Sequence, residues 1–374
     1  MIELQDIFKK YADEYMENHN LSYVQSKAVR AIINCRTSVM GAHIDICDEC
    51  GFEQISYNSC RNRHCPKCQT FAKEDWLDRQ KQNLLDRPYF HVVFTVPSEL
   101  NPIFYQNQKL LYALLFKAAS ETLLELCADS KYLGAKPGIT SVLHTWGQNL
   151  SYHPHLHCIV TGGGLTDLNT WKDSRKKFFL PIKVLSKKFR GKFLHYLQNE
   201  DLHFFGDAKY LANPSDFGNL ISKLYKTDWV LYCKPPFGNA QKVIDYLGRY
   251  THRVAISNNR IISEKDGQVS FKWRDYSDNN RQKIMSLTAD EFIRRFLMHI
   301  LPPGFRKIRH FGIFSSRNKT KRLKLCRRLT GTRFAFKSES PEQRLTRVFG
   351  EDWNLCPKCK SGRLSRASPS RAIA

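Results

Sequence analysis

The sequence predicts an α+β fold in which a β-sheet and amphipathic helices follow a small cysteine-rich module. Residues 152–160 alternate histidines with apolar side chains, which is the pattern of a β-strand. Residues 140–146 form a second strand, and the short loop between the two favours antiparallel pairing. Apolar residues recur at helical spacing from about 104 to 127. Six cysteines crowd between residues 35 and 68.

The composition points to a polyanionic partner. The chain of 374 residues carries 59 Lys and Arg against 35 Asp and Glu, a net charge of +24. Such an excess favours nucleic acid as the usual partner. The sequence contains no apolar run long enough to cross a bilayer and no signal peptide, so we expect no membrane partner and a cytoplasmic location.

Twelve cysteines in a chain expected to be cytosolic indicate metal binding rather than disulfides. Two Cys-x-x-Cys motifs, separated by 14 residues, have the spacing of a tetrahedral zinc site. We therefore predict a structural Zn²⁺ held by Cys47, Cys50, Cys65 and Cys68. Four neighbours either complete a second zinc site or pack around the first, namely Cys35, His43, Cys60 and His64. A third motif, Cys356–Cys359, needs two further ligands.

The histidine strand predicts a second kind of metal site. Because side chains alternate between the faces of a strand, His153, His155 and His157 share one face. Their imidazoles can hold a divalent metal ion. The opposite face presents apolar side chains that suit a core, namely Leu156, Cys158 and Val160.

A basic stretch near the C-terminal end predicts contact with single-stranded nucleic acid. Residues 292–338 contain 14 Lys and Arg and no Asp or Glu. Basic side chains follow phosphates and aromatic rings stack on bases, and aromatic residues interleave here as Phe305, Phe311, Phe314, Phe334 and Phe336. The expected DNA contacts are Arg306, Lys307 and Arg309 in this stretch and Arg61 and Arg63 in the cysteine module.

A helix predicted over residues 239–250 carries Tyr246 and Tyr250, which lie on one face because they are four residues apart. Alone, the pair is typical of ordinary helix packing. Beside a metal site in a basic chain, a tyrosine whose phenol can attack phosphorus indicates transesterification of a phosphodiester. The resulting phosphotyrosine keeps the bond energy, and the sequence has no phosphate-binding loop for ATP.

These motifs, in their order, resemble one known group of proteins. The order is Cys-x-x-Cys, Cys-Pro-x-Cys, Tyr-Phe-His-Val-Val-Phe-Thr-Val-Pro, His-Pro-His-Leu-His and Tyr-Leu-Gly-Arg-Tyr-Thr-His-Arg. It resembles the HUH endonucleases, and among them the rolling-circle insertion-sequence transposases with an N-terminal zinc-binding domain, over about residues 25–320. The resemblance implies an HUH fold, a central antiparallel sheet flanked by helices. It also implies metal-assisted cleavage and rejoining of single-stranded DNA at element ends through a 5′-phosphotyrosine, with Mg²⁺ or Mn²⁺.

The resemblance also assigns roles to residues. His155 and His157 become ligands of the catalytic metal, and Tyr246 and Tyr250 become nucleophiles. The third metal ligand is open: His153 lies on the right face of the strand, and its rivals are His144, Gln148 and Gln241. If one tyrosine acts alone, Tyr250 is favoured, because cationic side chains that can hold phosphate flank it, namely Arg249, His252 and Arg253.

We therefore expect four consecutive segments. They are a helical arm with the zinc-binding domain (1–85), the HUH catalytic domain (86–275), a basic helical DNA-binding region (276–340) and a partly disordered tail with a Cys-x-x-Cys motif (341–374). The expected partner is single-stranded DNA at transposon ends and target, in a bacterial, nucleoid-associated setting. A replication initiator or relaxase of the same superfamily and a non-catalytic zinc-dependent DNA-binding protein are the alternatives. The sequence leaves the oligomeric state open.

Overall fold

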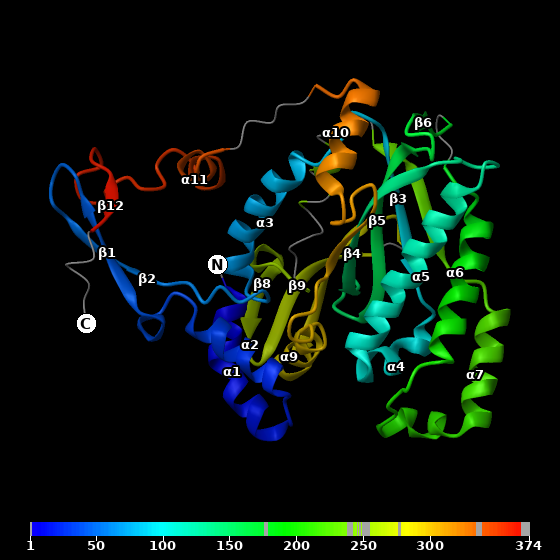
Figure 1. Cartoon of the computed structure of the whole chain (residues 1–374). Helices are drawn as coiled ribbons and strands as arrows, with labels where there is room; N and C mark the ends of the chain where they lie inside the picture. Colours follow the sequence, from blue (N-terminus) through cyan, green and yellow to red (C-terminus); the bar gives the residue numbers. More distant parts are fainter. Residues whose placement is uncertain are drawn as a thin grey trace. The chain divides into compact units, whose positions relative to one another are not determined.

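The histidine strand is the central strand of an antiparallel sheet in the computed structural model of the chain (Figure 1). Five strands form the main path of the sheet, in the spatial order β11 (Ile308–Gly312), β4 (Lys136–Trp146), β5 (Tyr152–Leu165, the histidine strand), β3 (Tyr89–Thr95) and β7 (Leu231–Phe237). A sixth strand, β6 (Trp171–Asp173), pairs with β5 beside this path.

The structure describes residues 2–175, 179–237, 242–244, 246, 248, 255–275, 278–333 and 339–367. The chain divides into two units made of segments far apart in the sequence. Unit 1 combines Met1–Asp78, His252–Ile300 and Phe336–Ala374, whereas unit 2 combines Arg79–Thr251 and Leu301–Ala335. Distant parts of the chain meet within each unit, since β12 (Leu364–Arg366) pairs with β1 (Ala42–Cys47) in unit 1 and β11 pairs with β4 in unit 2.

The core of unit 2 lies between one face of its sheet and two long helices. Helices α5 (Gln108–Ala128) and α6 (Ile182–Leu197) lie side by side against the sheet (Figure 1). Leu156, Cys158 and Val160 of β5 belong to this core, which confirms the apolar face predicted for the histidine strand. The opposite face of β5 is therefore left to the histidines.

The helix expected over 104–127 is interrupted. The chain forms α4 (Asn101–Gln106) and α5 instead, because the backbone of Asn107 leaves the helical conformation. The side-chain amide of Asn107 donates a hydrogen bond to the backbone carbonyl of His203 at 2.8 Å. The other helical elements of unit 2 are η2 (Ser98–Leu100), η3 (Gly206–Ala212), α7 (Pro214–Lys226) and α10 (Lys319–Thr330).

Unit 1 contains two small antiparallel sheets and a group of helices. One sheet has the order β12-β1-β2 and the other β10-β9-β8. Asp266 and Gly267 form the turn that joins β8 to β9, and both residues have the positive φ that a tight hairpin turn requires. The strands are β1 (Ala42–Cys47), β2 (Glu53–Tyr57), β8 (Ile261–Lys265), β9 (Gln268–Asp275), β10 (Arg281–Thr288) and β12 (Leu364–Arg366).

The helices of unit 1 begin with the expected helical arm, which breaks near Asn20 into two helices. The side chain of Ser22 caps the second by accepting from the N–H of Gln25 at 3.4 Å. Phe8 packs edge-on against Phe296 with ring centroids 5.3 Å apart, which joins the arm to α9. The helical elements are α1 (Leu4–Asn18), α2 (Tyr23–Asn34), η1 (Ser38–Met40), α3 (Pro66–Lys81, which runs on into unit 2), η4 (Asn258–Arg260), α9 (Ala289–Leu297) and α11 (Pro341–Phe349).

None of the helices in the described ranges combines the length and apolar character needed to cross a membrane.

Gly312 ends β11 at a close approach of two backbones. Its φ is +62°, and a Cβ at this position would lie 1.9 Å from the carbonyl oxygen of Pro137. Gly304 has a similar φ of +68° but no heavy atom within 4 Å of the corresponding Cβ position. The two glycines therefore separate the cost of left-handed backbone from the cost of a steric clash.

We expect Gly304→Ala to lower the free energy of unfolding by about 1 kcal/mol, the cost of left-handed backbone for a residue with a Cβ. Gly312→Ala adds displacement of β4 from β11 and is expected to cost at least about 3 kcal/mol. Urea unfolding of the two variants and the parent chain measures both values. Equal losses for the two variants would show that β11 does not approach Pro137 in this way.

Candidate functional site

Three histidines converge on one face of the sheet of unit 2. The antiparallel register sets His144 of β4 opposite His155 of β5. His144, His155 and His157 each offer a ring nitrogen, and these nitrogens lie within 4.8 Å of one another. The Nε2 atoms of His155 and His157 are 3.1 Å apart. Two nitrogens bound to one metal at about 2.1 Å are separated by about 3.0–3.4 Å, so this donor set fits a single divalent ion.

Burial keeps two of these imidazoles neutral. It lowers the pKa of His155 to about 3, with a further contribution from the neighbouring His153. It lowers the pKa of His157 well below its ordinary value, helped by His144 and His155. A neutral imidazole retains the lone pair that binds a metal, so His155 and His157 are in their ligand form throughout the physiological pH range.

The third member of the group is His144 rather than His153. Sequence reasoning placed His153 on the metal-binding face and kept His144 and Gln148 as rivals. In the structure the group of converging nitrogens contains His144 and does not contain His153. His155 Nδ1 instead lies 2.7 Å from the backbone carbonyl oxygen of His153, which turns its Nε2 towards His157. Gln148 lies in the connection between β4 and β5.

A tyrosine hydroxyl reaches the same group. The hydroxyl of the buried Tyr246 lies 2.9 Å from Nδ1 of His157 and 2.6 Å from Nε2 of His91. The two histidine nitrogens are themselves 2.9 Å apart. His157 therefore faces His155 with one nitrogen and the phenol with the other. One imidazole therefore links the group of converging nitrogens to a tyrosine hydroxyl.

His91 was missed by sequence reasoning, although the signal was present. It is a buried histidine in an otherwise apolar strand, β3, and lies on the same face as His157. Burial is the main cause that lowers the pKa of His91 to about 3, and the positive charge of Lys234 lowers it further. Lys234 is exposed and pairs with His91 across β3 and β7. It supplies a positive charge beside the histidines.

Five of the residues expected at this site lie outside the described residues. They are Gln241, Arg249, Tyr250, His252 and Arg253.

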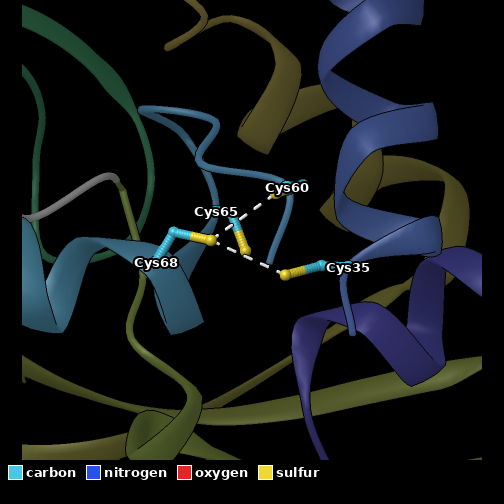
Figure 2. Close-up of side chains that lie close together, drawn as sticks. All are labelled: Cys35, Cys60, Cys65 and Cys68. Carbon is cyan, nitrogen blue, oxygen red and sulfur yellow. Dashed lines mark hydrogen bonds between the residues drawn. The ribbon is translucent and has the colours of Figure 1, made fainter. Parts of the chain in front are cut away.

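The cysteines of unit 1 form two clusters among the described residues, and Figure 2 shows the first. Cys35 follows α2, Cys60 lies in a loop, and Cys65 and Cys68 stand at the start of α3. The Sγ atom of Cys68 is 3.6 Å from the Sγ atoms of both Cys35 and Cys60. Four thiolates bound to zinc at about 2.3 Å are about 3.8 Å apart, so the cluster fits a tetrahedral zinc ion.

The second cluster contains Cys47, Cys50, Cys356 and Cys359. This finding corrects the prediction that Cys47 and Cys50 share one site with Cys65 and Cys68. The two Cys-x-x-Cys motifs have separate partners because the β1–β2 hairpin carries Cys47 and Cys50 to one end of the sheet, while the chain after β2 returns to Cys35.

His43 and His64, the other candidates for a second zinc ion, belong to neither cluster. His43 Nδ1 lies 3.3 Å from Asn58 Oδ1, and its Nε2 lies 3.6 Å from a carboxylate oxygen of Asp45. His64 Nδ1 lies 3.2 Å from Asn62 Oδ1. Both imidazoles are thus bound to polar side chains next to the clusters.

Two of the basic residues expected to contact DNA lie at a groove in unit 2, and Lys307 is not among the residues that line it. Arg306 and Arg309 border an open groove of about 1030 Å³, together with Lys109 and Lys319. Arg306 is exposed. Arg309 instead packs its guanidinium over the ring of Phe116 at 4.5 Å, and burial lowers its pKa.

Two of the five aromatic residues of this stretch lie in the core rather than on the surface, and Phe311 is half-buried at the groove. Phe305 and Phe314 are buried, so they form the wall of the groove and do not present free ring faces to bases. Phe334 and Phe336 lie outside the described residues. In unit 1, Arg61 is exposed and Arg63 half-buried, between Cys60 and Cys65.

Comparison with known proteins bears directly on this arrangement. The profile of a family described as "Putative transposase" matches residues 138–322, which include the histidine strand. The profile of a family described as "Transposase zinc-binding domain" matches residues 7–96. No solved structure matches the chain.

Two relatives match most of their own length. "Putative transposase y4qJ" of Sinorhizobium fredii (strain NBRC 101917 / NGR234) is 45% identical over 373 residues, 97% of this chain and 94% of the relative. "Transposase for insertion sequence element IS801" of Pseudomonas savastanoi pv. phaseolicola is 30% identical over 308 residues, 81% of this chain and 73% of the relative. The resemblance inferred from the motifs is thus confirmed, and the chain belongs to the family of insertion-sequence transposases with an N-terminal zinc-binding domain.

Proposed function

We propose that this transposase cleaves and rejoins a single strand of DNA at the ends of its element, through a covalent 5′-phosphotyrosine. The contact that carries the proposal joins the hydroxyl of Tyr246 to Nδ1 of His157 at 2.9 Å. It brings a nucleophile within reach of a phosphate held at the three imidazoles. A non-catalytic zinc-dependent protein that only binds DNA does not need a tyrosine hydroxyl beside these imidazoles.

The reaction is a transesterification at phosphorus. The oxygen of Tyr246 forms a bond to the scissile phosphorus, and the bond from phosphorus to the 3′-oxygen breaks in line with it. The 3′-oxygen takes up a proton and leaves as a hydroxyl group. Because one phosphodiester replaces another, the strand is rejoined by attack of a 3′-hydroxyl without ATP. Tyr250, four residues on, is the candidate for the second transfer.

The histidines beside Tyr246 hold its hydroxyl in place. If Nε2 of His157 faces the metal, its Nδ1 carries the proton and donates to the oxygen of Tyr246. The tyrosine O–H then donates to Nε2 of His91, 2.6 Å away. His91 is neutral, since burial holds its pKa near 3, so it can accept this hydrogen bond. A base of so low a pKa is a poor acceptor of the phenolic proton, so the proposed role of His91 is to orient the phenol.

His144, His155 and His157 would hold the metal ion, which withdraws charge from the scissile phosphate. Mg²⁺ prefers oxygen ligands, and affinity for nitrogen donors rises along the transition series. The imidazole group therefore favours Mn²⁺ over Mg²⁺ as the activating ion.

Exposed cations support a single-stranded substrate. Lys234 stands beside His91 on the histidine face, where its ammonium group can contact a phosphate. Arg306 borders the groove in the same unit. A flexible single strand can enter a groove of this size and still present its phosphate to the histidines, whereas a duplex is stiff.

We expect Tyr246→Phe to reduce covalent protein–DNA adduct by about 100-fold or more, since the nucleophile is removed. The assay uses a single-stranded oligonucleotide labelled at its 3′ end, Mn²⁺ and a denaturing gel. Tyr225→Phe, which removes an exposed hydroxyl from α7, is the matched control and should keep full activity. Undiminished adduct in the Tyr246→Phe, Tyr250→Phe double variant would rule out tyrosine chemistry.

We expect His144→Ala to weaken Mn²⁺ binding as much as His155→Ala does, by about 10-fold or more, because each removes one of the converging nitrogens. His153→Ala should leave the affinity within about twofold, because His153 is outside the group. Isothermal titration calorimetry compares the three variants. The opposite order, with His153→Ala the more damaging, would restore His153 as the third ligand.

We expect Arg306→Ala to weaken binding of single-stranded DNA and to reduce the slope of log K against log salt by about 0.7, the value for one lost phosphate contact. Lys226→Ala, which removes an exposed charge from α7, is the control for net charge alone. Fluorescence anisotropy over a range of salt concentrations measures both slopes. An unchanged slope in Arg306→Ala would remove the groove from the DNA path.

A further inference from the structure

The second cysteine cluster joins the two ends of the chain. Cys47 and Cys50 belong to the N-terminal β1–β2 hairpin, whereas Cys356 and Cys359 lie more than 300 residues later in the sequence. We propose that these four cysteines bind a second structural Zn²⁺ that fastens the C-terminal segment to the N-terminal hairpin. The matched zinc-binding domain ends at residue 96, so it contains only half of this site.

The distances between the sulfur atoms indicate a metal rather than disulfides. The Sγ atoms of Cys47 and Cys359 are 3.7 Å apart, as are those of Cys50 and Cys356. A disulfide requires about 2.05 Å. Four sulfurs at the corners of a tetrahedron, each about 2.3 Å from a central zinc ion, are about 3.8 Å apart. The first cluster shows nearly the same separation, 3.6 Å.

The two motifs form the same turn. The N–H of Gly51 donates to the carbonyl of Cys47 at 3.2 Å, and the N–H of Lys360 donates to the carbonyl of Cys356 at 3.0 Å. The residue after each second cysteine is left-handed, with φ of +66° at Gly51 and +57° at Lys360. A lysine rarely adopts this conformation, so the second turn is held by its surroundings. Matched turns present two pairs of thiolates to one point.

Close backbone contacts fit the two turns together. The N–H of Arg363 donates to the carboxylate of Asp48 at 2.7 Å, and the N–H of Asp48 donates to the carbonyl of Arg363 at 3.1 Å. A Cβ at Gly362 would lie 2.5 Å from Sγ of Cys47, so only glycine fits here. The N–H of Gly362 also lies 3.3 Å from Sγ of Cys359, a bond that favours a thiolate.

The C-terminal segment is bound to unit 1 on both sides of this cluster. β12 pairs antiparallel with β1, with Leu364 opposite Cys47. Before the cluster, Arg344 of α11 contacts Asp75 at 3.1 Å and Asp78 at 2.9 Å on α3. Part of the segment expected to be a partly disordered tail is therefore ordered from Ser340 to Ala367 in the described residues. Zinc would make this arrangement depend on metal.

Zinc stoichiometry of the full-length chain tests the proposal. A His155→Ala, His157→Ala background removes any zinc bound at the histidines. In that background we expect two zinc ions per chain by elemental analysis. We expect one after Cys47→Ser with Cys50→Ser, and one after Cys356→Ser with Cys359→Ser. Because both pairs serve the same ion, the quadruple variant should also keep one. The matched control, Cys127→Ala with Cys326→Ala, should keep two.

Thiol alkylation gives a second readout, which separates loss of this site from loss of the fold. Cys50 is exposed, so an alkylating reagent can reach its thiol once no zinc ion holds it. In the zinc-loaded parent chain we expect Cys50 to react at least about tenfold more slowly than after chelation. In the Cys356→Ser, Cys359→Ser variant Cys50 should react quickly while Cys68 stays protected, which shows that the first cluster is intact.

Two results would overturn the shared site. One is rapid alkylation of Cys50 in the zinc-loaded parent chain. The other is a zinc count that stays at two in either double variant, or falls to zero in the quadruple variant.

Discussion

The antiparallel register of β4 and β5 is the constraint on which the rest of unit 2 depends. It sets His144 opposite His155 and leaves His157 two residues further along the same face. The opposite face is fixed in the core by Leu156 and Cys158. A slip of one residue would exchange the two faces, turning the imidazoles into the apolar core and the apolar side chains away from it. The free energy that packs the core thus also holds the metal-binding group in place.

Unit 1 is stabilised in a different way. Its β1–β2 hairpin buries little apolar surface, and Ile55 and Tyr57 of β2 are 54% and 45% exposed. A hairpin of this kind is marginal without a further constraint. The second cysteine cluster takes two of its members from the hairpin itself, and the first takes members from the sequence before and after it. Each cluster can gain stability from a zinc ion. Zinc-bound thiolates would thus provide in unit 1 the stabilisation that apolar packing provides in unit 2.

The sequence predicted features whose signals are local and failed where partners are distant. The histidine strand and its apolar face follow from the alternation between residues 152 and 160, and the structure confirms the apolar face. The partners of Cys47 and Cys50 did not follow, because motif spacing favours the nearer pair, and the cluster forms with Cys356 and Cys359 instead.

His91 illustrates the same limit within unit 2. Its relation to Tyr246 is set by packing between residues 155 positions apart. No periodicity in the sequence predicts such a contact. The break between α4 and α5 could not be predicted for the same reason, because the side chain of Asn107 donates to the carbonyl of His203, which is distant in the sequence.

Peptide mapping of the covalent adduct tests the central claim, that the phenol bound to His157 attacks phosphorus. Trypsin cleaves after Lys242, Arg249 and Arg253, so Tyr246 and Tyr250 fall on separate peptides, 243–249 and 250–253. After reaction of the parent chain with a single-stranded oligonucleotide and Mn²⁺, mass spectrometry should find the nucleotide on peptide 243–249, attached to Tyr246. A nucleotide found only on peptide 250–253, or on neither peptide while the strand is cut, would contradict the account.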